Sequence, residues 1–319
     1  MPEATGQEVP HEKYQRLIKA AQALPAIKVA IAHPCDDVSL QGAVEAARLQ
    51  LIEPVLVGPV ERIRKVAKAA ELEIGAMEIV ASEHSHDSAT KAVGLVTEGR
   101  VEALMKGSLH TDELMGAVLA RDAGIRTARR ISHCFVMNVP RHPNALIITD
   151  AAVNIVPTLD DKVDIVQNAI DLAHAMGVTE VRVALLSAME TVTAKVPSTI
   201  EAAALCKMAD RGQITGALLD GPLALDNAIS PEAAAIKRIV SPVAGRANVL
   251  VVPDLEAGNM LAKSLSFLAH ADAAGIILGA RVPIILTSRA DSLIARQASC
   301  AVAVLIAHSR HAHLEKAVS

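Results

Sequence analysis

Short apolar runs alternate with longer amphipathic stretches along most of this chain. In its first part, each apolar run is short enough for a buried strand, and the stretch that follows has helical spacing. The apolar runs lie at 28–32, 55–58, 77–80 and 103–105, and helical patterns begin near residues 36, 59, 85 and 111. Alternation of this kind predicts an α/β fold in which helices connect parallel strands.

The pattern changes at Ile131. Two apolar runs, Ile131–Val139 and Leu146–Thr149, flank a segment rich in turn-forming residues, which predicts an antiparallel hairpin. Helix–strand alternation then resumes. It predicts helices over 162–176 and 199–210, strands over 181–186 and 214–219, and a last unit made of a strand over 284–287 and a helix from Asp291.

These patterns indicate two α/β domains with mostly parallel sheets and an active cleft between them. The first domain is expected to be discontinuous, with residues 1–130 and 273–319, because the last units repeat the pattern of the first part. The second domain, residues 131–272, is expected to be inserted in the first.

Capping residues stand at several expected helix starts. Asp36 or Asp37, Thr111 and Ser230 have side chains that can accept a hydrogen bond from a free helical N–H group. Ser198 and Glu201 have the spacing of a capping box.

The composition narrows the possible partners. Hydrophobic residues make up 51% of the chain, yet Tyr14, Phe135 and Phe267 are its only aromatic residues, so the core must be aliphatic. A net charge of −4 gives no basic surface for nucleic acid, and stacking platforms for bases are scarce. Cys35, Cys134, Cys206 and Cys300 lie far apart without a C-x-x-C motif, which favours buried reduced thiols over a zinc site or disulfides.

The chain has no obvious membrane segment. Its first twelve residues are polar and lack the pattern of a signal peptide, and no apolar run approaches the ~18 residues that span a bilayer. The longest run, Ala301–Ala307, is better interpreted as a buried helix face. We therefore expect a soluble cytoplasmic protein with no membrane partner.

Two common phosphate-binding motifs are absent from the sequence. Neither G-x-x-x-x-G-K-[ST] nor G-x-G-x-x-G occurs, which argues against P-loop kinases and dehydrogenases with a Rossmann fingerprint.

A cluster of polar residues follows the strand expected at 103–105. Gly107 would let the backbone approach a ligand, the helix start offers free N–H groups, and Lys106 supplies a positive charge. We predict that Lys106, Gly107, Ser108 and His110 bind an anionic ligand. The alternative is an ordinary loop with a solvent-facing lysine.

A second cluster follows the strand expected at 284–287. Ser288, Arg289 and Asp291 place a hydroxyl, a guanidinium and a carboxylate within four residues. This set suits a reaction in which an anion is held, a proton is removed and negative charge develops on oxygen. The alternative makes Ser288 a helix cap and Arg289 part of a surface salt bridge.

Other polar groups admit simpler interpretations. Asp254 and Asn259 follow an apolar run and are candidate substrate-binding residues, but helix capping is favoured over a metal site because their spacing matches no metal motif. His308, His311 and His313 cannot all share one helix face, so a metal site there is disfavoured. Cys134, beside His133, is interpreted as a buried strand cysteine in preference to a nucleophile.

Taken together, these segments resemble the phosphate acetyl/butyryltransferase family over nearly the whole chain. The likeness is densest in Met105–Ser108, Ile148–Ile155, Asp220–Leu223 and Ser241–Ser292. The first two of these segments look more like the butyryl branch than the acetyl branch.

The resemblance implies a two-domain αβα protein of the isocitrate/isopropylmalate dehydrogenase-like fold, usually a homodimer. The implied reaction is reversible transfer of a short acyl group between CoA and inorganic phosphate, both of them substrates, with no cofactor and no metal. A base would deprotonate the CoA thiol, and the thiolate would attack the acyl carbonyl. Ser288 matches the family serine that stabilises the intermediate or the departing phosphate, and Arg289 matches the adjacent substrate-binding arginine.

Two positions depart from the family pattern. Ala295 stands where the acetyl branch has its proposed aspartate base, which leaves Asp291 as the nearby carboxylate. The run Leu114–Val118 lacks the arginine that usually binds phosphate, and Arg129 or Arg130 is the expected substitute, with Arg126 nearby. These departures leave a catalytically impaired CoA-binding paralogue as one alternative function. An NAD-dependent decarboxylating dehydrogenase of the same fold type is the other.

Overall fold

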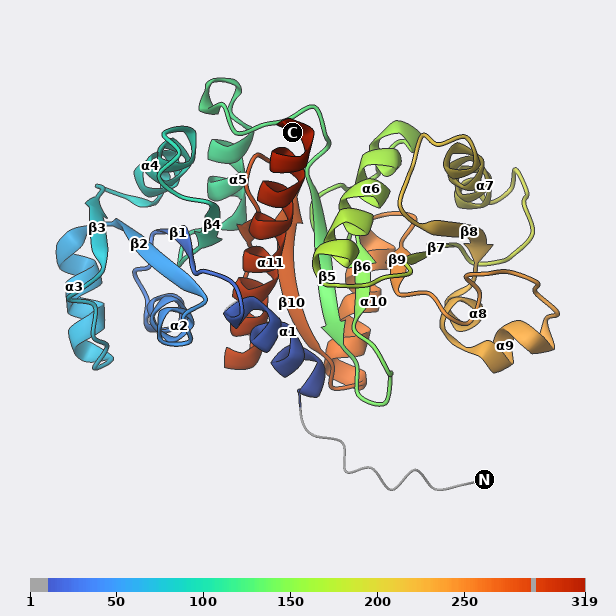
Figure 1. Ribbon diagram of the computed structural model, residues 1–319, viewed down its shortest axis with the longest axis horizontal. Coiled ribbons are helices and arrows are strands. Elements are labelled where there is room, and N and C mark those ends of the chain that lie inside the picture. The colour runs from blue at the N-terminus through green and yellow to red at the C-terminus, as the bar shows by residue number, and fades with distance from the viewer. Residues whose placement is uncertain (1–10, 288–290, 319) are drawn as a thin grey trace.

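One sheet of eleven strands forms the centre of the computed structural model, which describes residues 11–287 and 291–318 (Figure 1). The strands lie in the order β3-β2-β1-β4-β11-β10-β5-β6-β9-β7-β8. Two groups of strands are each mutually parallel: the first is β3, β2, β1, β4 and β11, and the second is β6, β9, β7 and β8. Between these groups, β10 runs antiparallel to both β11 and β5, and β5 runs antiparallel to β6.

The first part of the chain repeats a strand–helix unit. Its elements are α1 (Glu12–Gln22), β1 (Ile27–Ala32), α2 (Asp37–Arg48), β2 (Ile52–Gly58), α3 (Val60–Ala69), β3 (Glu78–Ala81), α4 (Ser85–Thr97), β4 (Ala103–Lys106), α5 (Thr111–Leu119) and the short 3₁₀ helix η1 (Arg121–Ala123).

The remaining elements extend the sheet and then return to the first strands. They are β5 (Ser132–Asn138), β6 (Leu146–Thr149), α6 (Leu159–Ala175), β7 (Arg182–Leu186), α7 (Pro197–Asp210), β8 (Leu218–Leu223), α8 (Leu225–Ile229), α9 (Pro231–Ile236), β9 (Val249–Val251), α10 (Leu255–Leu268), β10 (Asp272–Leu278), β11 (Ile284–Ile285) and α11 (Leu293–Val318).

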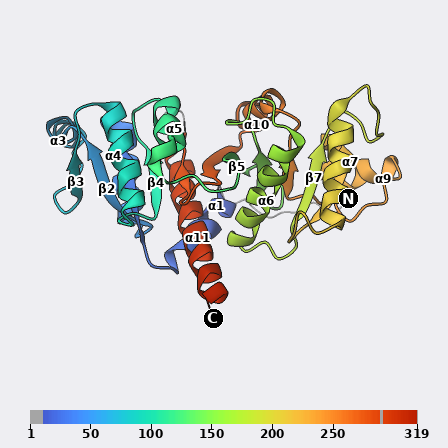
Figure 2. The same cartoon turned by 90° about the horizontal axis from the view of Figure 1, so that it is seen from above.

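Helices cover both faces of the sheet. Three groups of buried side chains show this: one joins the strands to α1, α2, α3, α6, α7 and α11, a second joins them to α4 and α5, and a third to α8, α9 and α10. Seen from above, α5 and α10 lie on the same side of the strands, and α11 lies on the opposite side (Figure 2). The result is a three-layered α/β architecture with a mostly parallel, mixed sheet.

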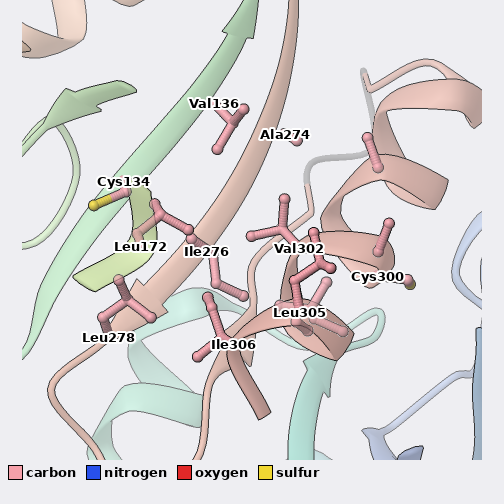
Figure 3. Close-up of a cluster of buried hydrophobic side chains, with 14 of the residues drawn as sticks. Cys134, Val136, Leu172, Ala274, Ile276, Leu278, Cys300, Val302, Leu305 and Ile306 are labelled. Atoms are coloured by element: carbon pink, nitrogen blue, oxygen red, sulfur yellow. The ribbon is translucent and has the colours of Figure 1, made fainter. Parts of the chain in front are cut away.

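The central helix α11 packs on β10, and α6 packs on β5. Cys134 and Val136 of β5 and Ala274 and Ile276 of β10 belong to the same cluster of buried side chains as Val302, Leu305 and Ile306 of α11 (Figure 3). All residues of the run Ala301–Ala307 are buried, which confirms the expected buried segment. Because side chains alternate along a strand, His133 and Phe135 must lie on the opposite face of β5.

Several expectations about local structure are confirmed. The hairpin forms, with Cys134 opposite Thr149 and Phe135 opposite Ile148. Asp36 caps α2 by accepting a hydrogen bond from the Ser39 N–H (2.8 Å), and Ser230 caps α9 through the Ala233 N–H.

Other expectations are wrong. The strand expected over 214–219 is displaced to Leu218–Leu223, because Gly216 has φ +85° and turns the chain just before it. Helix α5 is capped at His110 and not at Thr111. Ser198 and Glu201 make no capping box: α7 begins with Pro197, Ser198 bonds Ser187, and Glu201 pairs with the buried Lys162.

Within the described residues, no helix combines the length and apolar character that crossing a membrane requires.

Candidate active site

A cavity of about 730 Å³ lies where the β4–α5 loop, β5, α10 and the chain after β11 meet. Five of the predicted site residues line it: Lys106, Ser108, His110, Asn259 and Asp291. Ser288 and Arg289 lie outside the described residues, but their neighbours Thr287 and Asp291 both line this cavity. The described members of the two polar clusters, which are Lys106, Ser108 and His110 of the first and Asp291 of the second, therefore line one cavity.

The remaining predicted residues are not part of the cavity wall that the structure describes. Gly107, Arg129, Arg130 and Asp254 are absent from its lining. Their surroundings show what each of them does instead.

Gly107 is packed against the protein's own backbone. The Gly107 N–H donates to the Ala32 carbonyl (2.9 Å), and the Ser108 N–H and hydroxyl donate to the His33 carbonyl (2.9 and 2.8 Å). A Cβ at Gly107 would lie 2.3 Å from the Ala32 oxygen. The β4–α5 loop is therefore fixed to the loop after β1, which places Lys106 and Ser108 at the cavity.

The start of α5 is already occupied by a carboxylate. Glu113 accepts hydrogen bonds from the His110 N–H (2.8 Å) and from the Ser85 hydroxyl (2.7 Å). The Ser85 hydrogen bond, followed by the His110 N–H, lowers the pKa of Glu113. Charged Glu113 reduces the positive potential of this helix start, so Lys106 carries more of any anion binding here.

Asp254 acts as a helix cap, because its side chain accepts a hydrogen bond from the Ala257 N–H (2.8 Å) at the start of α10. Asn259, one turn later, lines the cavity and donates to the Ala151 carbonyl (3.4 Å). Lys263 and Phe267 follow on the same helix and also line the cavity. Lys263 and Phe267 were not predicted from the sequence, although the spacing of Asn259, Lys263 and Phe267 at i, i+4 and i+8 places them on one helix face.

Arg129 and Arg130 extend to different partners. Arg129 pairs with Asp171 on the exposed side of α6. Arg130 donates from Nε to the Asn154 side-chain oxygen (2.8 Å) and lies 3.4 Å from Asp161.

The Asn154 amide in turn donates to the buried Asp150 carboxylate (2.6 Å), which also accepts from the N–H groups of Ala152, Val153 and Asn154. Arg130 thus supports the loop after β6, and Ala152 of that loop lines the cavity.

Two β5 side chains form part of the cavity wall. The rings of His133 and Phe135 meet edge to face with centroids 4.3 Å apart. Burial lowers the pKa of His133 to about 4, although the nearby Asp150 carboxylate acts in the opposite direction. In the sequence, His133 stood out only as the neighbour of Cys134. The signal was the strand alternation, since a buried Cys134 places His133 on the other face.

Cys134 is fully buried in β5, which confirms its structural interpretation. Burial raises the pKa of its thiol to about 12, so it stays protonated at neutral pH.

The chain after β11 forms the last wall. The Asp291 carbonyl accepts from Arg296 (2.7 Å), and the Ser292 hydroxyl donates to Asp272 (3.1 Å), so this segment is held at both α11 and β10. Ala295, the residue that departs from the pattern of the acetyl branch, also lines the cavity and contributes only a methyl group.

The cavity combines groups suited to an anionic substrate and a proton transfer. Lys106 and Lys263 supply positive charge, Asp291 supplies a carboxylate, and Ser108 and Asn259 supply polar contacts. In the part of the chain that the structure describes, no group of three or more His, Cys, Asp or Glu side chains is arranged to hold a metal ion.

This chain matches a known protein family over most of its length. Residues 80–304 match a family model described as phosphate acetyl/butaryl transferase. A phosphate acetyltransferase of Rhizobium meliloti is 66% identical over 94% of this chain and 95% of its own. A phosphate butyryltransferase of Clostridium beijerinckii is 38% identical over 93% of this chain and 98% of its own.

A solved structure gives the same result. The crystal structure of a branched-chain phosphotransacylase from Enterococcus faecalis V583 is similar to this chain with a TM-score of 0.78 and 32% identity. The similarity covers 88% of this chain and 99% of that protein.

Proposed function

Since the chain belongs to the phosphate acetyl/butyryl transferase family, we propose that its cavity catalyses reversible transfer of a short acyl group between CoA and inorganic phosphate. The observation that carries this proposal is the convergence of Lys106, Ser108, Asn259 and Asp291 on one cavity. Family membership favours this acyl transfer over the alternatives of an NAD-dependent dehydrogenase and an impaired CoA-binding paralogue.

In the direction from acyl phosphate to acyl-CoA, Asp291 accepts the proton of the CoA thiol. The thiolate then attacks the acyl carbonyl carbon, and the carbonyl oxygen takes up the negative charge. When the carbonyl re-forms, the bond from carbon to the phosphate oxygen breaks and inorganic phosphate leaves. The acyl group passes directly from phosphate to sulfur, so no covalent acyl-enzyme forms.

The other residues bind substrate and stabilise charge. Lys106 and Lys263 bind the phosphates of the two substrates, and Ser108, His110 and Asn259 orient them within the cavity. Arg289 holds the transferred phosphate, and Ser288 donates to the charge that develops in the transition state. One such donor is typically worth on the order of 10²–10³ in rate.

We infer that acetyl is the preferred acyl group, because the chain shares far more identity with the Rhizobium acetyltransferase than with the Clostridium butyryltransferase. CoA and phosphate act as substrates, with no cofactor. The proposed architecture is isocitrate/isopropylmalate dehydrogenase-like, with lobes at 1–130 plus 273–319 and at 131–272 and with the cavity between them. The proposed assembly is a homodimer.

The test uses the purified protein with acetyl-CoA or butyryl-CoA and inorganic phosphate, and it follows the release of free thiol. Phosphate-dependent release that is faster with acetyl-CoA is expected, with or without a chelator. Failure of both acyl-CoA substrates to release thiol, or reduction of NAD in a parallel assay with 2-hydroxy acids, would overturn the proposal.

A further inference from the structure

The wall of the cavity contains a histidine with an unused hydrogen-bonding nitrogen. His133 lines the cavity, yet only 1% of its surface is exposed. Among the residues that the structure describes, Nδ1 has no hydrogen-bond partner, and it is shielded from solvent. A buried polar atom without a partner costs free energy, so an unpaired nitrogen on a side chain of the cavity wall points to a partner that the bound ligand supplies.

The position of the ring is set by the sheet. Cys134 and Val136 lie in the buried cluster that includes α6 and α11, so the alternating His133 and Phe135 lie on the opposite face of β5, at the cavity. Phe135 meets the imidazole edge to face, and Gly275 leaves space behind it, since a Cβ there would lie 3.1 Å from Nε2. The ring is therefore held in place by packing, while Nδ1 has no hydrogen-bond partner among the described residues.

The ring is neutral near pH 7, because burial lowers its pKa to about 4. A neutral imidazole carries one N–H proton, which resides on either ring nitrogen according to the partners present. Such a group is a poor base for a thiol but a good donor to an oxygen on which negative charge develops. The Asp150 carboxylate already accepts hydrogen bonds from four N–H groups, so the imidazole N–H of His133 is not needed as a donor to it.

We propose that His133 is a catalytic residue whose neutral imidazole donates its N–H to an oxygen of the bound acyl phosphate. This proposal rests on the acyl transfer proposed above and adds a donor that the Ser288–Asp291 cluster does not include. The acceptor is either the acyl carbonyl oxygen or a phosphate oxygen, because both accept a hydrogen bond and carry negative charge during the reaction.

Three variants test the role of this N–H. His133→Leu fills a similar volume without a donor, His133→Asn places an amide near the position of Nδ1, and His133→Gln places one near Nε2. Met137→Leu is the matched control, because Met137 is buried on the same face of β5 but does not line the cavity. Initial rates are measured against acetyl phosphate, CoA and inorganic phosphate, and thermal unfolding is measured for every variant.

We expect His133→Leu to lower kcat or kcat/KM by about 10²-fold or more. Its melting temperature should be no lower than that of the wild type, because it removes a buried unpaired nitrogen. One of the two amide variants should recover at least tenfold of the loss, and that variant identifies the donating nitrogen. A fall in kcat assigns the contact to the carbonyl oxygen, whereas a raised KM for phosphate assigns it to the phosphate.

A second readout does not depend on turnover. In protein labelled with ¹⁵N-histidine, the His133 ring signals, identified by their absence in His133→Asn, should shift when acetyl phosphate and desulfo-CoA bind. Wild-type rates in a folded His133→Leu, equal losses in all three variants, or unshifted ring signals would overturn the role of His133. An inactive wild type would instead overturn the proposed function itself.

Discussion

The backbone nitrogen of Gly107 lies 2.9 Å from the carbonyl oxygen of Ala32, and a Cβ at Gly107 would lie only 2.3 Å from that same oxygen. The contact joins the loops after β4 and β1, and both of its sides are backbone, which cannot move aside as a side chain can.

Gly107→Ala should therefore lower the free energy of unfolding by roughly 1–3 kcal/mol or more, as overpacking does. Gly116→Ala is the matched control: its Cβ meets no atom within 4 Å, and alanine within a helix should stabilise by up to about 1 kcal/mol. Urea unfolding followed by circular dichroism measures both changes. Equal stability of the two variants would contradict the close approach.

The buried imidazole of His133 makes stability depend on pH. The folded protein binds this proton only near pH 4, whereas an unfolded histidine binds it near pH 6.5. Between these values the unfolded chain holds more protons, so the contribution to the free energy of unfolding falls as pH drops from about 6.5 to about 4. The wild type should lose stability relative to His133→Asn over this interval. Parallel urea midpoints for both proteins from pH 7 to pH 4.5 would contradict the lowered pKa.

Arg130 and Arg129 should differ sharply in their effect on activity. Arg130 holds Asn154 and, through it, the Asp150 loop beside the cavity, whereas Arg129 pairs with Asp171 on the exposed side of α6. Arg130→Ala should raise the KM for phosphate about tenfold or more, because small displacements at a site are costly. Arg129→Ala, the matched control, should be nearly silent. Initial rates measured at increasing phosphate concentration give the KM of each variant. Equal KM values for both variants would refute the predicted difference.

The proposed base gives a distinctive pH signature. Asp291→Asn should lower kcat for acetyl-CoA formation about 10²–10⁴-fold near pH 7. The loss should shrink toward pH 9, because a thiol with a pKa of about 8.5 then ionises without help. Asp272→Asn is a control within the same cavity and should show no such narrowing. A loss in Asp291→Asn that stays constant with pH would assign Asp291 to a different role.

Ser288 and Arg289 remain predicted from the sequence. Ser288→Ala should lower kcat by about 10²–10³-fold, and Arg289→Ala should lose most activity because it also removes the orientation of phosphate. Circular dichroism should show both variants folded. Rates near those of the wild type in both would remove this segment from the active centre.

The fold was predictable where local pattern and tertiary structure agree. The strand–helix alternation and the hairpin follow from hydrophobic spacing and turn residues alone. Strand β10 was not predicted, because its first residues, from Asp272 to Gly275, are small or polar and have low intrinsic strand preference. It forms because partners on both sides, β5 and β11, satisfy its backbone.

The site was predictable only in part. Lys106, Ser108, His110, Asn259 and Asp291 gather as strand ends predict. The orientation of Arg129 and Arg130 depends on ion pairs with α6, about thirty to forty residues further along the chain, which no local pattern encodes. His133 carries no motif, and only the face it shares with Phe135 places it at the cavity.

The pairing of β10 with β5 also has a consequence for biosynthesis. Asn138 and Asp272 are partners across 134 residues, and β11, the other neighbour of β4, is made later still. While the chain is being synthesised, β4 and β5 therefore each present an open edge that can pair with another nascent chain. Strands β10 and β11 close both edges, so a ribosome stalled before β10 would release an aggregation-prone fragment, however complete its earlier helices are.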